Sequence, residues 1–193
     1  MRVAIIGAGI AGLTAARALS AAGTSVRVFD KGRGVGGRLA TRGREQGAFD
    51  HGAQRFSARS DAFRQEVQQW HSAGWITETE RRSDEPWFLP VPSANSLAQS
   101  LAAGLGVQSS MRATALLRER GAWHLRFEGA PSEGPFDVVL CTAPAPQSGA
   151  LFGPHDVFRA ELGTIRYDPT WALMLGCDSA EIAGASQVHL EWG

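Results

Sequence analysis

Three glycines near the start of the chain, Gly7, Gly9 and Gly12, constrain the fold more than any other feature of the sequence. They directly follow the apolar residues 3–6, a short run that is typical of a buried parallel strand. The alanine- and leucine-rich residues 13–22 that come next predict a helix. A buried strand that passes through a glycine-rich turn into a helix indicates an α/β fold.

A second apolar run completes this unit. Residues 26–29 predict another strand, which ends at Asp30. Strand, turn, helix and strand within about thirty residues match the size of a βαβ unit. In the turn, Gly7 permits the sharp bend, Gly9 leaves space for a pyrophosphate against the backbone, and Gly12 lets the helix pack closely on the sheet. The positive N-terminus of the helix would then face the phosphates.

The aspartate at the end of the second strand extends this motif. Its carboxylate can accept hydrogen bonds from a ribose diol and would repel a ribose 2′-phosphate, which disfavours NADP. The alternative is an ordinary strand-to-helix turn with a solvated aspartate, but the strand, the helix and the acid all stand where the motif needs them. The sequence therefore predicts a dinucleotide site formed by Gly7, Ala8, Gly9, Ile10, Ala11, Gly12 and Asp30.

A second glycine-rich segment, Gly36-Gly37-Arg38, follows shortly after the second strand. Its glycines allow another close approach to a dinucleotide, and the Arg38 guanidinium has donors that match phosphate oxygens. An incidental arginine in a flexible loop is the alternative. Lys31 begins the glycine-rich loop that leads to this segment. With the Thr41 hydroxyl after it, the segment resembles the glycine-doublet motif of glutathione-reductase-type and amine-oxidase-type flavoproteins. That resemblance implies FAD as the cofactor.

The first fifty-odd residues together resemble one branch near the flavin amine oxidases, the renalase-like FAD-dependent oxidoreductases. Residues 31–41 and 49–54 carry the closest likeness, and residues 136–140, 143–147 and 167–175 extend it along the chain. The resemblance adds four residues to the expected cofactor site, His51, Gly52, Ala53 and Gln54.

Within this added segment, backbone N–H groups and the Gln54 amide are expected to line the flavin ring. His51 could act as an acid or base, but a structural histidine that fixes its loop is the favoured interpretation. The resemblance implies an enzyme in which the flavin takes a hydride from a small substrate and dioxygen reoxidises it to give hydrogen peroxide. The implied substrates are dihydro-isomers of NAD(P)H.

Two alternative functions fit the same motifs. One is a flavin amine oxidase or desaturase that acts on another small molecule, and the other is a non-catalytic, truncated dinucleotide-binding module. The truncation is expected because family members return late in the sequence with a Gly-Asp motif that this chain lacks. Asp30 is a second departure, since the family usually has glutamate there.

The fold expected from these patterns is α/β, with a parallel Rossmann-type FAD/NAD(P)-binding sheet and an interleaved mixed α+β substrate region. We assign residues 1–58 and 130–150 to the Rossmann domain, and residues 59–129 and 151–193 to an incomplete substrate region.

Several further elements are expected between and after the Rossmann segments. Ser60 is placed to cap a helix that buries Phe63, Val67 and Trp70 and ends at Gly74. The remaining expectations are a surface loop over 81–86, an amphipathic helix through Leu97, Leu101 and Leu105, a hairpin around Gly121, a buried strand over 136–141 that Pro144 and Pro146 stop, and a strand over 171–175.

Composition excludes other classes of function. Lysine plus arginine and aspartate plus glutamate both number 19, and this net charge of zero argues against nucleic-acid or membrane-surface binding. Cys141 and Cys177 lie far apart and outside any metal-binding spacing, so we expect two reduced thiols and no metal site. The expected partner is a small molecule, either a dihydropyridine nucleotide or an amine, in a cytoplasmic protein. The oligomeric state is left open.

Overall fold

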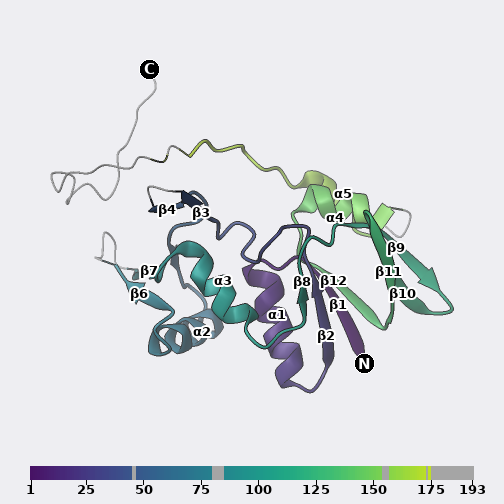
Figure 1. Ribbon diagram of the computed structural model, residues 1–193, viewed down its shortest axis with the longest axis horizontal. Helices are drawn as coiled ribbons and strands as arrows, with labels where there is room; N and C mark the ends of the chain where they lie inside the picture. The colour runs from purple at the N-terminus through teal and green to yellow at the C-terminus, as the bar shows by residue number, and fades with distance from the viewer. Residues whose placement is uncertain (45–46, 80–84, 154–156, 173, 175–193) are drawn as a thin grey trace.

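A four-stranded parallel sheet organises the computed structural model, which describes residues 1–44, 47–79, 85–153, 157–172 and 174 (Figure 1). The strand order is β12-β1-β2-β8. The strands are β1 (Arg2–Ile6), β2 (Ser25–Phe29), β8 (Val107–Gln108) and β12 (Val138–Cys141). Both neighbours of β1 run parallel to it. The prediction of an α/β fold built on a parallel sheet is confirmed.

The first helix, α1 (Ile10–Ala21), begins three residues earlier than the sequence predicts, because Gly9 itself is its N-cap. Gly23 follows the helix with φ of +77°, a left-handed conformation in which glycine is favoured. The predicted end of the helix is therefore confirmed.

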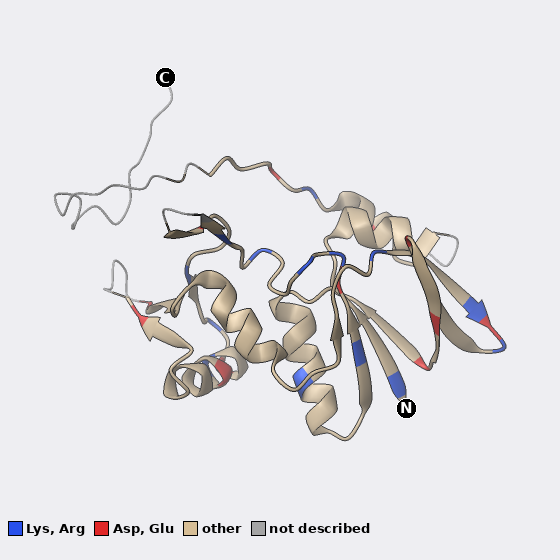
Figure 2. Ribbon diagram, in the orientation of Figure 1, with Lys and Arg blue, Asp and Glu red and all other residues tan. Residues whose placement is uncertain are grey.

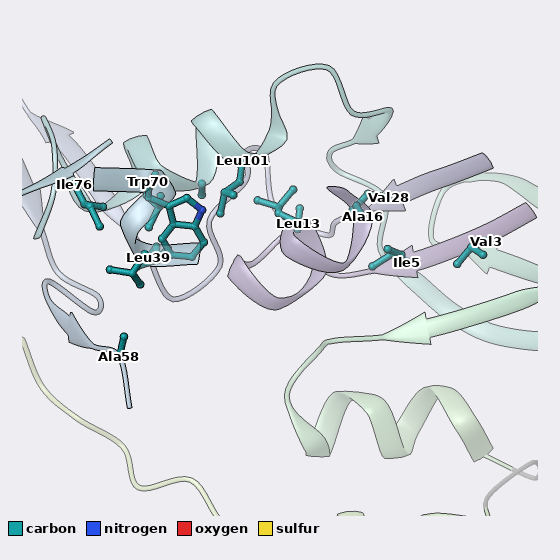
Figure 3. Packing of buried hydrophobic residues seen from close by; sticks show 14 residues of the cluster. Val3, Ile5, Leu13, Ala16, Val28, Leu39, Ala58, Trp70, Ile76 and Leu101 are labelled. Atoms are coloured by element: carbon teal, nitrogen blue, oxygen red, sulfur yellow. The ribbon is translucent and has the colours of Figure 1, made fainter. Parts of the chain in front are cut away.

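Alternate residues of the sheet face two different cores. Val3, Ile5 and Val28 pack against α1, and the cluster continues through Leu13 and Leu101 to Trp70 and Ile76 (Figure 3). On the other face, Ala4, Ile6 and Phe29 pack against an antiparallel sheet. Side chains of a strand point alternately to opposite faces, so burial of both sets places the sheet in the centre of the molecule.

That antiparallel sheet consists of β9 (Ala113–Glu119), β10 (Ala122–Phe127) and β11 (Ala130–Phe136). The predicted hairpin around Gly121 is confirmed, since Glu119 pairs with Ala122 across a two-residue turn. Arg120 and Gly121 in this turn both have positive φ, at 51° and 86°. This geometry fits the twist of paired strands.

The region between residues 41 and 102 contains two small sheets and two helices. One sheet pairs β3 (Thr41–Arg44) with β4 (Gly47–Asp50), and the other has the order β5 (Phe56–Ser57), β7 (Trp87–Pro90), β6 (Ile76–Glu78). The helices are α2 (Asp61–Ser72) and α3 (Ala94–Ala102). The Ser60 hydroxyl accepts a hydrogen bond from the Phe63 N–H at 3.3 Å, which confirms the predicted cap of α2.

Two predictions in the second half of the chain were wrong in part. Leu105 lies beyond the end of α3, although it packs on the same core as Leu97 and Leu101. The predicted strand over 136–141 is divided, because Phe136 ends β11 and β12 starts at Val138. It is also not fully buried: β12 is an edge strand and Val138 is 37% exposed.

The prolines after β12 do stop the strand, but they also start a helix that the sequence analysis missed. Pro144 is the N-cap of α4 (Ala145–Phe152), and Pro146 stands in its first turn. Proline is favoured there because its missing N–H would have no partner within the helix. A short helix, α5 (Arg159–Thr164), follows.

The strand predicted over 171–175 is not observed in the part of that range that the structure describes. Residues 171, 172 and 174 have no strand structure, and Trp171 is 98% exposed, while 173 and 175 lie outside the described residues. Most of the loop predicted over 81–86 and the distant Cys177 also lie outside them. The division into two domains remains a prediction.

Candidate functional site

A groove of about 920 Å³ lies where three strands of the parallel sheet end. Ile6 ends β1, while Asp30 and Thr142 directly follow β2 and β12, and all three line the groove. The carboxyl edge of a parallel sheet is where α/β proteins bind ligands, and the volume lies within the usual range for such sites. The predicted site residues that line the groove are Gly7, Gly9, Ile10, Ala11, Asp30, Lys31, Gly36, Gly37, Arg38 and Ala53.

Two of the three motif glycines are required by packing within the protein. Gly7 has φ of +108°, and a Cβ there would lie 2.7 Å from the Thr142 hydroxyl oxygen. At Gly12, a Cβ would collide with the carbonyl oxygen of Gly7. These two positions therefore have no room for a side chain, whether or not a ligand is bound.

Gly9 is different, because none of the described residues restricts it. The nearest atom to a Cβ at Gly9 would be the carbonyl oxygen of Gly36, 3.9 Å away, and its φ of −79° suits any residue. The residue faces the groove at the start of α1, where the first N–H groups of a helix have no partner within the helix. The space that glycine leaves at this position therefore belongs to the groove.

The second glycine pair packs backbone to backbone against the first turn. The Gly36 N–H donates a hydrogen bond to the carbonyl oxygen of Ala8 at 2.8 Å, and Gly36 forms a parallel bridge with Gly9. Gly37 has φ of +57°, and a Cβ there would lie 3.4 Å from the Cα of Gly9. The two glycine-rich segments, distant in the sequence, thus form one wall of the groove and bring Arg38 to it.

Asp30 connects the two loops at the end of β1 and β2. Its two carboxylate oxygens accept hydrogen bonds from the N–H groups of Ala8 and Gly32, each at 2.6 Å. A carboxylate oxygen can accept more than one hydrogen bond, so these contacts orient the group and still leave capacity for a ligand hydroxyl.

The groove carries an excess of positive charge although the whole protein is neutral. Lys31, Arg38, Arg55 and Arg112 line it, and Asp30 is the only carboxylate among the described residues that do so. Arg112 pairs with Glu128 at 3.0 Å, whereas no ion pair with a described carboxylate is formed by the other three cations. Figure 2 shows basic positions on the loops above the parallel sheet. An anionic ligand would supply the missing partners.

The remaining predicted residues lie outside the groove lining. The Thr41 hydroxyl donates to Asp50 at 2.5 Å and accepts from the Asn95 N–H at 3.0 Å. The Gln54 amide donates to the carbonyl oxygen of Asp50 at 2.8 Å. A Cβ on Gly52 would collide with the carbonyl oxygen of Arg38. Roles of Thr41, Gly52 and Gln54 at a cofactor stay predictions, as do those of Ala8 and Gly12.

The histidine of this segment is partly buried, and its Nδ1 has no hydrogen-bond partner among the described residues. The His51 backbone N–H donates to the carbonyl oxygen of Ala40 at 3.2 Å, which fixes the loop. His51 does not line the groove, so the contact that would make it an acid or base toward a ligand there is not observed.

More than half of the residues that line the groove were not predicted from the sequence. Three stretches supply most of the lining residues that were not predicted: Arg55 and Phe56, Met111 to Thr114, and Thr142 to Pro144. Phe63 of α2 also lines the groove. Thr142 could have been found, because it directly follows a strand of the parallel sheet. No local pattern marks residues 111–114, which reach the groove through the antiparallel sheet.

Comparison with known proteins agrees with this architecture. A sequence model of the NAD(P)-binding Rossmann-like domain matches residues 5–78. Among solved structures, a protein from Exiguobacterium sp. 255-15, provisionally described as a protoporphyrinogen oxidase, is similar with a TM-score of 0.66 and 15% sequence identity. The match covers 84% of this chain and 63% of that protein, so the chain spans less than two thirds of its length. At this identity the likeness is one of fold.

Two absences concern only the described residues. No helix there has the length and apolar character needed to cross a membrane. No group of histidine, cysteine, aspartate or glutamate side chains within those residues could hold a metal ion.

Proposed function

We propose that the chain binds FAD in this groove and serves as the cofactor-binding part of an oxidoreductase that takes a hydride from a small substrate. The observation that carries the proposal is the open space at Gly9. It lies at the N-terminus of α1 and beside Arg38 and Lys31, which no described carboxylate neutralises. A pyrophosphate matches this combination of free backbone N–H groups, helix dipole and cations.

The second glycine pair supports FAD over a nicotinamide cofactor. Gly36 and Gly37 pack against Gly9 and extend the groove beyond the first turn, toward Ala53. A dehydrogenase that binds only NAD needs the first turn and an acid such as Asp30, but not this extension. The glycine-doublet segment therefore favours the longer flavin dinucleotide.

For the reaction, we propose a renalase-like oxidation of dihydro-isomers of NAD(P)H. FAD held in the groove would supply the hydride acceptor, and its reoxidation by dioxygen with uptake of a proton would give hydrogen peroxide. The residues of this chain bind the pyrophosphate, orient the substrate and shield it from water. Such a reaction requires no strong general base, and among the described residues the groove lining offers no histidine and no carboxylate except Asp30, which two N–H groups already engage.

The experiment that tests this reaction is a substrate screen on the purified chain loaded with FAD. Under anaerobic conditions, dihydronicotinamide isomers should bleach the flavin absorbance, and admission of air should restore it with release of about one equivalent of peroxide. If amines reduce the flavin and the dihydronicotinamide isomers do not, an amine oxidase or desaturase replaces this proposal.

A further inference from the structure

The two ends of the groove differ in chemistry. At one end, the Met111 N–H donates to the carbonyl oxygen of Asp30 at 2.8 Å, and β9 then contributes Ala113 and Thr114, on the side of the molecule where Figure 1 shows the antiparallel sheet. The opposite end lies near α2 and is lined by Arg55, Phe56 and Phe63. Asp30 is expected to bind the ribose next to adenine, so this aromatic end lies toward the reactive half of a bound dinucleotide.

Phe56 is held rigidly at the aromatic end by three other rings. Its ring centroid lies 5.9 Å from those of Phe63 and Phe88 and 6.1 Å from that of Trp70. Trp70 is only 3% exposed, whereas Phe56 and Phe63 are partly exposed and line the groove. This arrangement gives the groove a fixed aromatic surface on which a planar ring can pack.

Arg55 supplies a positive charge at the edge of that surface. Its guanidinium carbon lies 4.9 Å from the centroid of the Trp87 ring, which holds the side chain in a cation–π contact. Arg55 is partly buried, and no described carboxylate pairs with it. An arginine that is held in place and has no anionic partner among the described residues is suited to recognise a carboxylate or phosphate.

We propose that Arg55, Phe56 and Phe63 form a substrate subsite that selects planar, anionic molecules. The ring of the substrate packs against the two phenylalanines, and its anionic group binds the Arg55 guanidinium. A protonated amine would meet the same positive charge and be repelled. This inference rests on the proposed function and makes it more specific. It assigns recognition of the charge of the substrate to Arg55, a residue that neither glycine motif includes.

Benzoate and protonated benzylamine test the subsite, because they share a phenyl ring and differ in charge. Calorimetric titration of the full chain should give a dissociation constant about tenfold lower for benzoate than for benzylammonium. Arg55→Met should weaken benzoate binding about tenfold and leave benzylammonium binding no weaker. Arg55→Lys should retain most of the preference, since it keeps the charge.

Arg59→Met is the matched control, because the Arg59 side chain is 82% exposed, pairs with Glu85 and does not line the groove. It should leave both affinities unchanged. The proposal is overturned if benzylammonium binds as tightly as benzoate, or if Arg55→Met, shown to be folded by its thermal unfolding, retains the preference.

The flavin content of the same samples separates this inference from the proposed function. Equal flavin absorbance in the wild type and in Arg55→Met, with the preference for benzoate lost, supports both. If the wild-type chain never takes up FAD, the proposed function is refuted. If Arg55→Met still abolishes the preference for benzoate in that case, the subsite is supported independently.

Discussion

Gly9 and Gly12 differ at the scale of single residues, although only three positions separate them. A methyl group on Gly12 would collide with the backbone of Gly7, while one on Gly9 would project into the groove. The protein itself therefore requires glycine at position 12 but not at position 9, and under the proposed function the space at Gly9 holds the ligand.

This contrast predicts that two alanine variants lose different amounts of stability. Gly12→Ala should lower the free energy of unfolding by roughly 1–3 kcal/mol or more, because the helix must move away from the sheet. Gly9→Ala should cost at most about 1 kcal/mol, the loss of a favoured N-cap residue. Urea unfolding of both variants checks this, and equal losses would contradict the distinction.

A larger side chain at Gly9 tests the ligand directly. Gly9→Val should fold and yet lose retained flavin, because its two methyl groups would occupy the space of the pyrophosphate. Flavin absorbance per protein after gel filtration measures this, with the wild type as reference. Unchanged flavin retention in this variant would refute the assignment of the pyrophosphate site.

Sequence analysis found the glycine motifs because each depends on backbone conformation within a short segment. It did not find Thr142, whose hydroxyl donates to the carbonyl oxygen of Gly7 at 3.1 Å. Arg55 was also not predicted, because the spacing of glycines and acidic residues along the sequence does not mark it. Contacts that the fold makes between distant segments leave no local pattern in one sequence.

At the scale of secondary-structure elements, the N-terminus of α3 is held by the β3–β4 hairpin. Asp50 accepts hydrogen bonds from the Thr41 hydroxyl at 2.5 Å and from the Ala94 N–H at 3.0 Å. Thr41 in turn accepts from the Asn95 N–H. A carboxylate at a helix N-terminus is stabilised by the free N–H groups and the helix dipole.

We therefore predict that Asp50→Ala lowers the free energy of unfolding by roughly 1–3 kcal/mol, since the buried Ala94 N–H and the partly buried Thr41 hydroxyl lose their acceptor. Asp61→Ala is the control, because Asp61 lies in the first turn of α2 with a side chain that is 91% exposed and contacts only Arg64 among the described residues. It should cost at most about 0.5 kcal/mol. Similar losses for both aspartates in urea unfolding would contradict this capping role.

Elements with strong local signals were predicted well, and those set by long-range packing were not. The helix α2 has Ser60 at its start and an apolar face, so its position followed from the sequence. The prolines before α4 were interpreted only as the end of a strand, because proline fits both a break and a first helical turn. The apolar residues 171–175 suggested a strand, but strand formation also needs a neighbour with which to pair.

At the scale of the whole molecule, an ion pair joins the parallel sheet to the antiparallel one. Arg27 in β2 binds Glu133 in β11 through two hydrogen bonds of 2.6 and 2.9 Å, with side chains 30% and 29% exposed. The parallel sheet, its glycine turn and the β9–β10 hairpin were predictable, but the third strand β11 and the packing of this sheet on the second face of the parallel sheet were not. No residue in β9–β11 specifies by its local pattern which surface it will cover.

A double-mutant cycle of Arg27→Met and Glu133→Gln should give a coupling energy of about 1 kcal/mol that decreases at high salt. The pair of Arg112 and Glu128, with side chains 60% and 69% exposed, is the control and should couple by less than about 0.5 kcal/mol. Equal coupling energies in both pairs would show that the ion pair between the sheets stabilises the protein no more than an exposed ion pair does.

The most direct test of the central claim is the absorbance spectrum of the purified chain after incubation with FAD and gel filtration. We predict a flavin band that elutes with the protein and releases FAD on denaturation, because the glycine turn, the α1 N-terminus and the cations that no described carboxylate neutralises suit a dinucleotide. A folded but colourless protein would contradict the assignment of this groove as an FAD site.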